Sequence, residues 1–248
     1  MSDSDLRLMQ DAEELDRRNV DVCLLGESAY PARLAALPQA PPVLFMWGNV
    51  ELLDAGGVGM CGSRHASEKG LNAASVCGEE VARHSLTVIS GYAKGVDTET
   101  HLAALGSGGR TVIVLAEGIS WFRKKKAFDR VGLDAERALV VSQFAPSQRW
   151  NVGAAMTRNA VIAGLGKALV VIEAGETGGT LNAARQAMEM SRPVLALEFT
   201  EGTPIGNQTL FGQGAIPIRS RAQLGRVLDT ISATPDSQPL RADQLSLL

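Results

Sequence analysis

The sequence predicts an α/β protein with a doubly wound, mostly parallel sheet. Three segments, at residues 111–115, 168–173 and 193–198, read TVIVL, ALVVIE and PVLALE. Apolar residues at consecutive positions indicate strands that are buried on both faces, as in a parallel sheet covered by helices. Predicted strands also alternate with predicted helices, which is the pattern of this fold class. The chain has 248 residues, of which 45% are hydrophobic, so it can bury a sizeable core.

Local patterns predict each element in chain order. The first 20 residues read as a charged helix, and residues 29–42 carry four prolines, which break regular structure. The apolar run Val43–Trp47 predicts an edge strand. The other predicted strands are Val58–Cys61, Leu86–Ser90, Thr111–Leu115, Ala138–Ser142, Leu169–Glu173 and Pro193–Leu197. The helices between them are Lys69–His84, Asp97–Leu105 with Asp97 as its cap, Ala155–Leu165 and one that ends near Met190.

These patterns divide the chain into three parts. They are a helical and extended lead-in packed on the core (1–54), the doubly wound domain (55–220), and a C-terminal helix with a flexible tail (221–248). No apolar run reaches the roughly 18 residues of a membrane helix, and the polar start argues against a secretory signal. The three cysteines form no CxxC pair. We therefore expect a cytoplasmic protein with reduced thiols and no membrane partner.

The charge of the chain is unevenly distributed. The chain has 24 basic and 27 acidic residues, unlike a protein that coats duplex DNA with a basic surface. The window 121–130 (WFRKKKAFDR) nevertheless carries +4, which leaves −7 for the rest. Aromatic rings beside cations suit single-stranded nucleic acid, where bases stack and phosphates are neutralised. The alternative is that the rings anchor the segment to the core while the lysines face water. Candidate DNA contacts here are Trp121, Arg123, Lys124, Lys125 and Lys126.

Three loops that follow predicted strands combine glycines with hydroxyl or cationic side chains. They are Gly62-Ser63-Arg64, the loop from Ser90 and Gly91 to Lys94 and Gly95, and Gly178-Gly179-Thr180 at a helix start. Free N–H groups and the helix dipole favour an anion at a helix N-terminus. In doubly wound sheets, ligands bind outside the carboxyl ends of the strands. The loops, with Arg158 as a further donor, therefore predict a phosphate pocket.

Several other chemistries find little support. Residues 57–62 (GVGMCG) match GxGxxG, but these glycines fall within a strand rather than between strand and helix, which argues against NAD binding. No P-loop occurs, the three histidines lack metal-ligand spacing, and a Ser–His–Asp triad around Asp97 and His101 is disfavoured. Glu173 ends a strand that faces the pocket. It could act as an acid or base, or as a structural hydrogen-bond acceptor.

The motifs, taken together, resemble the DprA/Smf family of DNA-processing proteins. The most specific match is Ser90-Gly91-Tyr92-Ala93-Lys94-Gly95-Val96-Asp97 followed by His101. Further matches are Tyr30-Pro31, Gly62-Ser63-Arg64 with Ser67 and Gly70, Arg158-Asn159 with Ile162–Leu165, Glu173 with Gly179-Thr180-Leu181, and Gly206-Asn207 with Leu210. The resemblance covers residues 30–217 and implies an extended Rossmann-like fold.

The resemblance also implies a function. It implies a non-catalytic, dimeric protein without a cofactor that binds single-stranded DNA and hands it to a RecA-type recombinase during DNA uptake or recombination. It assigns the grip on the DNA backbone to Arg64, Lys94 and Arg158, with Ser63, Ser90, Gly91 and Gly179-Thr180 shaping the pocket. Only 29 residues precede Tyr30 and 30 follow Ile218, so we expect a divergent member with the Rossmann-like domain alone.

One alternative comes from a different functional class. The wider superfamily includes nucleotide-sensing domains and phosphoribohydrolases, whose glycine loop is similar to Gly178-Gly179-Thr180. The hydrolases place a glutamate three residues after the threonine, where this chain has Ala183. A third possibility is a scaffold that has lost its ligand. The retention of Arg64 and Lys94 argues against that possibility.

Overall fold

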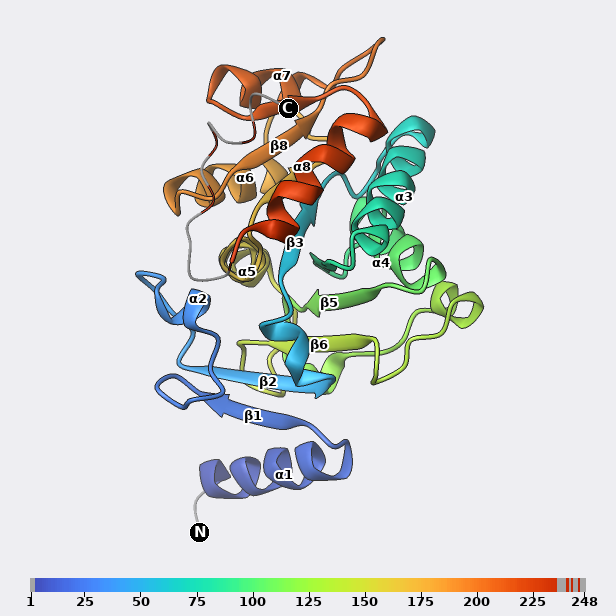
Figure 1. Cartoon of the computed structure of the whole chain (residues 1–248). Coiled ribbons are helices and arrows are strands. Elements are labelled where there is room, and N and C mark those ends of the chain that lie inside the picture. The colour runs from blue at the N-terminus through green and yellow to red at the C-terminus, as the bar shows by residue number, and fades with distance from the viewer. Residues whose placement is uncertain (1–2, 236–239, 241, 243–244, 246–248) are drawn as a thin grey trace.

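A nine-stranded sheet forms the centre of the computed structural model, which describes residues 3–235, 240, 242 and 245 (Figure 1). The strand order is β1-β2-β6-β5-β4-β3-β7-β8-β9. All pairs from β6 to β9 are parallel, whereas β2 is antiparallel to both β1 and β6. The strands are β1 (Asp21–Leu24), β2 (Val43–Gly48), β3 (Gly57–Cys61), β4 (Thr87–Ser90), β5 (Arg110–Val114), β6 (Ala138–Ser142), β7 (Leu169–Val171), β8 (Val194–Leu197) and β9 (Ile216–Ile218). The predicted mostly parallel α/β sheet is confirmed.

Helices cover both faces of the sheet. They are α1 (Asp3–Arg17), α2 (Ala32–Ala35), α3 (Glu68–Arg83), α4 (Val96–Gly106), α5 (Val152–Leu165), α6 (Gly179–Glu189), α7 (Ile205–Gly212) and α8 (Arg221–Ala233). Leu169 and Val171 of β7 pack in one core with α5 and α6, whereas Val170 packs in the other with α3 and α8. This alternation explains why the central strands are apolar at consecutive positions.

Three local predictions are wrong. β2 is an interior strand, because the unpredicted β1 pairs with its outer side. Within the proline-rich segment, residues 32–35 form a short helix despite the surrounding breaks. The α4 helix begins one residue earlier than predicted and has Gly95, not Asp97, at its cap. Gly95 has φ +77°, and a side chain there would meet the backbone carbonyl of Ser63.

Both ends of the chain add to this framework. The first two residues of the predicted N-terminal helix lie outside the described part of the chain. Most of the tail for which flexibility is predicted also lies outside it, although Leu240 and Leu245 are buried against the core beside α8. No helix among the described residues is both long and apolar enough to cross a lipid bilayer.

The sheet reverses its winding between β3 and β7. From β3 the chain builds β4, β5 and β6 on one side, and it then crosses through α5 to place β7 on the other side of β3. Such a switch point leaves a crevice at the carboxyl ends of the two strands. The loops after β3, β4 and β7 and the N-terminal half of α5 all meet there.

Candidate anion-binding site

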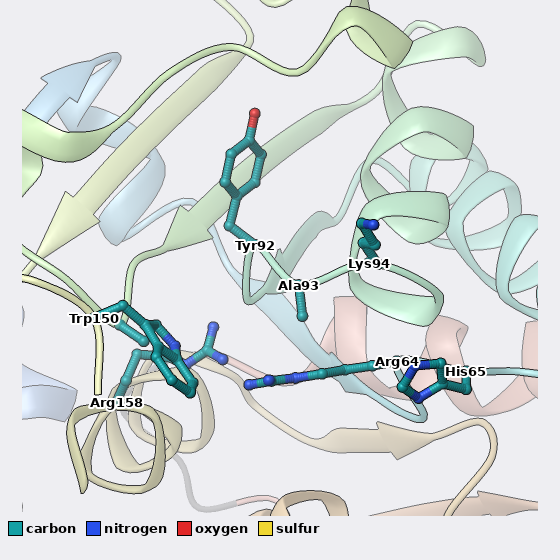
Figure 2. A pocket seen from close by; sticks show the side chains of 8 residues that line it. Arg64, His65, Tyr92, Ala93, Lys94, Trp150 and Arg158 are labelled. Atoms are coloured by element: carbon teal, nitrogen blue, oxygen red, sulfur yellow. The ribbon is translucent and has the colours of Figure 1, made fainter. Parts of the chain in front are cut away.

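A pocket lies at the switch point and consists of two adjoining cavities. One has a volume of about 270 Å³ and the other of about 400 Å³, and both are lined by Arg64, Ala93, Trp150 and Arg158. Figure 2 shows the first cavity, in which Arg64 extends across the pocket toward Trp150 and Arg158. The first cavity adds His65, Tyr92, Lys94 and Ala116; the second adds, among others, Cys61, Gly62, Ser63, Asp97, Asn159, Gly179, Thr180 and Ala183.

The loop after β3 presents Arg64 to the pocket. The Ser63 N–H donates to the carbonyl of Glu173 at 2.8 Å, which ties this loop to the end of β7. Its hydroxyl accepts from the N–H of His65 at 3.0 Å. The Arg64 guanidinium is then free to lie over the ring of Trp150, 5.4 Å from the ring centroid. Gly62 lets the start of this loop pack against α4, since a Cβ there would collide with the side chain of Val96.

The loop after β4 places Lys94 at the pocket, whereas Gly91 lines neither cavity. Lys94 is exposed at the rim, where no hydrogen bond or ion pair ties its ammonium group to the described residues. Gly91 is buried, and a Cβ there would collide with Arg158 Nη1 and Asp97 Oδ2. Ser90 does not line the pocket. It is fully buried, and its hydroxyl donates to the Met60 carbonyl at 2.7 Å, so its role is to join β4 to β3.

Arg158 forms the floor of the pocket. It lies on α5, is 6% exposed, and its Nη1 donates to the Val114 carbonyl at 2.7 Å. Its Nε has no hydrogen-bond partner among the described residues. Burial lowers the pKa of this guanidinium and the charge of Asp97 partly offsets that shift, while Arg64 adds to it. Arg158 lines both cavities, and a guanidinium in that position is a ready binding group for an anion.

The glycine loop before α6 supplies backbone donors. Gly178 is the N-terminal cap with φ +109°, and no side chain caps the helix. Gly179 is exposed, and a Cβ built on it would meet no atom within 4 Å. Asn159 on α5 donates to the Gly179 carbonyl at 3.3 Å, which fixes the loop beside the helix that carries Arg158. Gly179 and Thr180 line the second cavity, and Gly178 lies just outside it.

The basic segment is divided between anchoring and exposed residues. Phe122 packs against Tyr92 and Trp47, and Phe128 is fully buried, so these two rings anchor the segment, in line with the alternative interpretation of this window. Lys125 points inward and donates to the carbonyls of Tyr92 (2.7 Å) and Ala93 and to the Thr98 hydroxyl.

The remaining members of the segment lie at the surface. Lys124 pairs with Asp129 at 2.7 Å, and Arg123 donates to the Ser120 and Phe122 carbonyls. Lys126 and Trp121 are exposed. No member of the segment lines the two pocket cavities. Burial lowers the pKa of Lys125, with Asp97 opposing and Lys94 reinforcing that shift.

The acidic side chains near the pocket have structural partners. The Glu173 carboxylate accepts from the N–H and hydroxyl of Ser67, which itself caps α3. Asp97 accepts from the N–H of Ala93 at 3.2 Å and shapes the loop after β4. Among the described residues, no three His, Cys, Asp or Glu side chains are placed to hold a metal ion.

Sequence reasoning missed Trp150. Its ring is 46% exposed and lines both cavities, yet it follows a predicted strand by eight residues in an irregular loop. The signal that could have found it is a bulky apolar residue in the otherwise polar run SQRWN.

The geometry defines a class of protein: a doubly wound α/β protein with a cation-lined pocket at its switch point. A family model described as DNA recombination-mediator protein A matches residues 21–229. The chain therefore belongs to this family, which confirms the resemblance to DprA/Smf proteins.

Individual relatives agree with this assignment. The chain is 36% identical over 197 residues to "DNA processing protein DprA" of Streptococcus pneumoniae, which covers 76% of this chain and 67% of that protein. It is 33% identical over 208 residues to "Protein Smf" of Escherichia coli, covering 82% of this chain but 55% of that protein.

Solved structures give the same result. The X-ray structure of DprA from Streptococcus pneumoniae aligns with a TM-score of 0.75 and 30% identity, over 90% of this chain and 78% of that one. The structure of DprA from Helicobacter pylori, described as giving insight into the single-stranded DNA binding mode of that protein, aligns with a TM-score of 0.74 over 84% of this chain and 95% of that one. At 20% identity, the second likeness shows the fold alone.

Proposed function

We propose that this protein binds single-stranded DNA through the phosphates, in the pocket at the carboxyl ends of β3, β4 and β7. The carrying observation is that three cations from three separate elements, Arg64, Lys94 and Arg158, line one pocket. The N-terminus of α6, which no side chain caps, adds backbone donors at the second cavity. Net charge is negative over the whole chain, so the polyanion binds at this site rather than over the surface.

The pocket is better suited to binding a DNA strand than to hydrolysing a free nucleotide. Ala183, at the position where the related hydrolases carry a glutamate, is 4% exposed and lines the second cavity without any carboxylate. Asp97, which lines the second cavity, and Glu173, which lines neither, already accept hydrogen bonds from backbone N–H groups. These observations support a binding protein rather than an enzyme.

Membership of the family supports the wider role. The family's own description is a recombination mediator, and a single-stranded DNA binding mode is described for the Helicobacter pylori protein. We extend the proposal accordingly: the chain acts in the cytoplasm, as a homodimer, and hands single-stranded DNA to a RecA-type recombinase.

Fluorescence anisotropy with a labelled 20-nucleotide oligo-dT, titrated at several salt concentrations, tests the proposal. Wild type should bind with a salt-dependent affinity. Lys94→Ala should weaken binding equally for all base compositions, because phosphate contacts carry no base information. The log–log salt slope should fall in magnitude by about 0.7, the single-strand value for one phosphate contact. Absence of binding at low salt, together with a thermal shift from a nucleoside phosphate, would instead establish the nucleotide-sensing alternative.

A further inference from the structure

The loop that connects β6 to α5 carries a second feature beside the pocket. Its residues Arg149 and Trp150 are neighbours, and each takes part in a cation–π contact with a different part of the chain. Trp150 lies under Arg64 at 5.4 Å, and Arg149 lies over Trp121 at 4.0 Å, both measured to the ring centroid. We call these four residues the tryptophan–arginine ladder.

The ladder is held in place by backbone contacts. The Trp121 indole N–H donates to the Ser147 carbonyl at 2.9 Å, and the Gly118 and Ser120 N–H groups donate to the Gln148 and Pro146 carbonyls. Trp121 therefore lies beside Ser147, three residues before Trp150. Three residues span at most about 11 Å, so the backbone of Trp150 lies within about that distance of the Ser147 carbonyl that Trp121 contacts.

Both indoles are open to solvent in spite of their size. Trp150 is 46% exposed and Trp121 is 37% exposed, and they are among the few large apolar side chains at the surface of the described chain. An arginine on one face of each ring fixes the ring and leaves other parts of the indole accessible. Rings fixed beside cations are the arrangement that stacks bases and neutralises the adjoining phosphates of a single strand.

The ladder begins at the pocket and leads away from it. Trp150 and Arg64 line the pocket itself, whereas Arg149 and Trp121 lie outside its two cavities. Beyond Trp121 the chain continues into Arg123, Lys124 and Lys126, whose side chains are exposed. The carboxylate of Asp11 approaches this loop and accepts a hydrogen bond from the Ser147 hydroxyl at 3.4 Å.

We propose that the strand leaves the phosphate pocket along this ladder, with successive bases stacked on Trp150 and then on Trp121. The inference rests on the proposed function and adds to it the direction in which the DNA extends and the groups that contact its bases. The pocket thus supplies the phosphate contacts, and the ladder supplies contacts that do not depend on base identity, because every base has a π-face.

The experiment compares two ligands of equal length and charge: a 20-nucleotide oligo-dT and a 20-unit strand with abasic sugars. Trp121→Ala should weaken binding of oligo-dT about tenfold, the size of effect for one stacked base, and leave the abasic strand within twofold of wild type. Trp121→Phe should keep most of the oligo-dT affinity because a ring remains. Phe199→Ala is the matched control, since Phe199 also lies under a lysine, 4.7 Å from Lys69, and lines neither pocket cavity.

Equal losses for both ligands, or an equal loss from Phe199→Ala, would overturn the ladder, because the effect would then not come from base stacking at Trp121. If wild type binds neither strand, the proposed function is wrong, and the ladder, which rests on it, is wrong as well. If wild type binds both with salt dependence and Trp121→Ala binds oligo-dT like wild type, only the ladder fails.

A second readout does not depend on the alanine variant folding. The chain has three tryptophans, the third being Trp47. Oligo-dT should quench the fluorescence of wild type. In Trp121→Phe/Trp150→Phe, binding should persist while the quenching disappears. Unchanged quenching from the remaining Trp47 would contradict the proposal.

Discussion

The Nη1 atom of Arg158 donates a 2.7 Å hydrogen bond to the carbonyl oxygen of Val114, which joins the helix α5 to the last residue of the strand β5. This bond uses one of the five donors of the guanidinium and leaves Nε without a partner among the described residues. Burial also lowers the pKa of Arg158, which means that removing this guanidinium from water is energetically unfavourable. A buried cation that lines both cavities is accounted for by the anionic ligand that we propose for this pocket.

Arg158→Ala should abolish most of the DNA affinity and also destabilise the fold. The variant leaves the Val114 carbonyl without its donor and the buried Asp97 without a neighbouring cation, which should lower the free energy of unfolding by about 2 kcal/mol. Urea denaturation measures the stability and anisotropy measures the affinity. Lys94→Ala is the control, since its exposed side chain should affect affinity alone. If the DNA affinity of Arg158→Ala were unchanged, Arg158 would not be part of the DNA-binding site.

Gly91→Ala should damage the same site without removing any charge. The added methyl group would collide with Arg158 Nη1 and Asp97 Oδ2, so the guanidinium must move. We expect a loss of DNA affinity together with a destabilisation of about 1–3 kcal/mol, as for other overpacked sites. The measurements are anisotropy and a denaturation curve.

Gly179→Ala provides the contrast to this variant. A Cβ there meets no atom within 4 Å, so the free energy of unfolding should stay within about 0.5 kcal/mol of wild type or rise. A large loss of stability in Gly179→Ala, or none in Gly91→Ala, would contradict this account of the packing.

Lys125→Ala and Lys126→Ala should behave differently despite their adjacent positions. Lys125 holds the loop after β4 through the carbonyls of Tyr92 and Ala93 and the Thr98 hydroxyl, whereas Lys126 is exposed. Removing Lys125 should lower the free energy of unfolding by about 1–2 kcal/mol, or the melting temperature by roughly 2–8 °C, while Lys126→Ala should leave both unchanged. Differential scanning calorimetry of the two variants checks this, and equal melting temperatures would show that Lys125 has no anchoring role.

The central sheet is predictable from the sequence because its strands are apolar on both faces. The strand β1 is not predicted, because it is only four residues long and, although Val22, Cys23 and Leu24 are all apolar, only Cys23 is buried, so its burial follows neither the sequence nor the pattern of the central strands. The omission of β1 is also why the sequence predicts β2 as an edge strand.

The site is predictable to the extent that it depends on strand ends. Arg64 and Lys94 meet because they follow β3 and β4, whose carboxyl ends lie at one edge, and Arg158 joins them from α5. Ser90 lies outside both cavities, and the local sequence does not show that the hydroxyl of this last strand residue bonds to the Met60 carbonyl of the neighbouring strand. Trp150 was missed because its place in the site depends on Arg64, which is distant in the sequence.

His101 should make the stability of the protein depend on pH in the mildly acidic range. The ring is fully buried, with Nε2 2.7 Å from the Gly91 carbonyl and Nδ1 2.5 Å from the Thr111 hydroxyl. Burial lowers its pKa from 6.5 to about 4, so the ring is neutral at pH 7 and Nε2–H donates to the Gly91 carbonyl. The Thr111 hydroxyl has one proton for two nearby acceptors, Nδ1 and the Val88 carbonyl at 3.0 Å. The unfolded chain then binds a proton that the folded chain does not, at every pH between these two values.

The stability that this ring contributes is therefore fully present above pH 6.5 and is lost progressively as the pH falls toward 4. When the pH has fallen to about 4, the loss in unfolding free energy amounts to about 3 kcal/mol, because a pKa shift of one unit corresponds to about 1.36 kcal/mol. Urea denaturation of wild type and His101→Gln between pH 4 and pH 7.5 isolates this contribution, because the other titrating groups are common to both proteins. The difference in unfolding free energy between the two should shrink as the pH falls. A difference that stays constant over this range would show that His101 titrates alike in the folded and unfolded chains, and its bond to the Gly91 carbonyl would then not depend on a neutral ring.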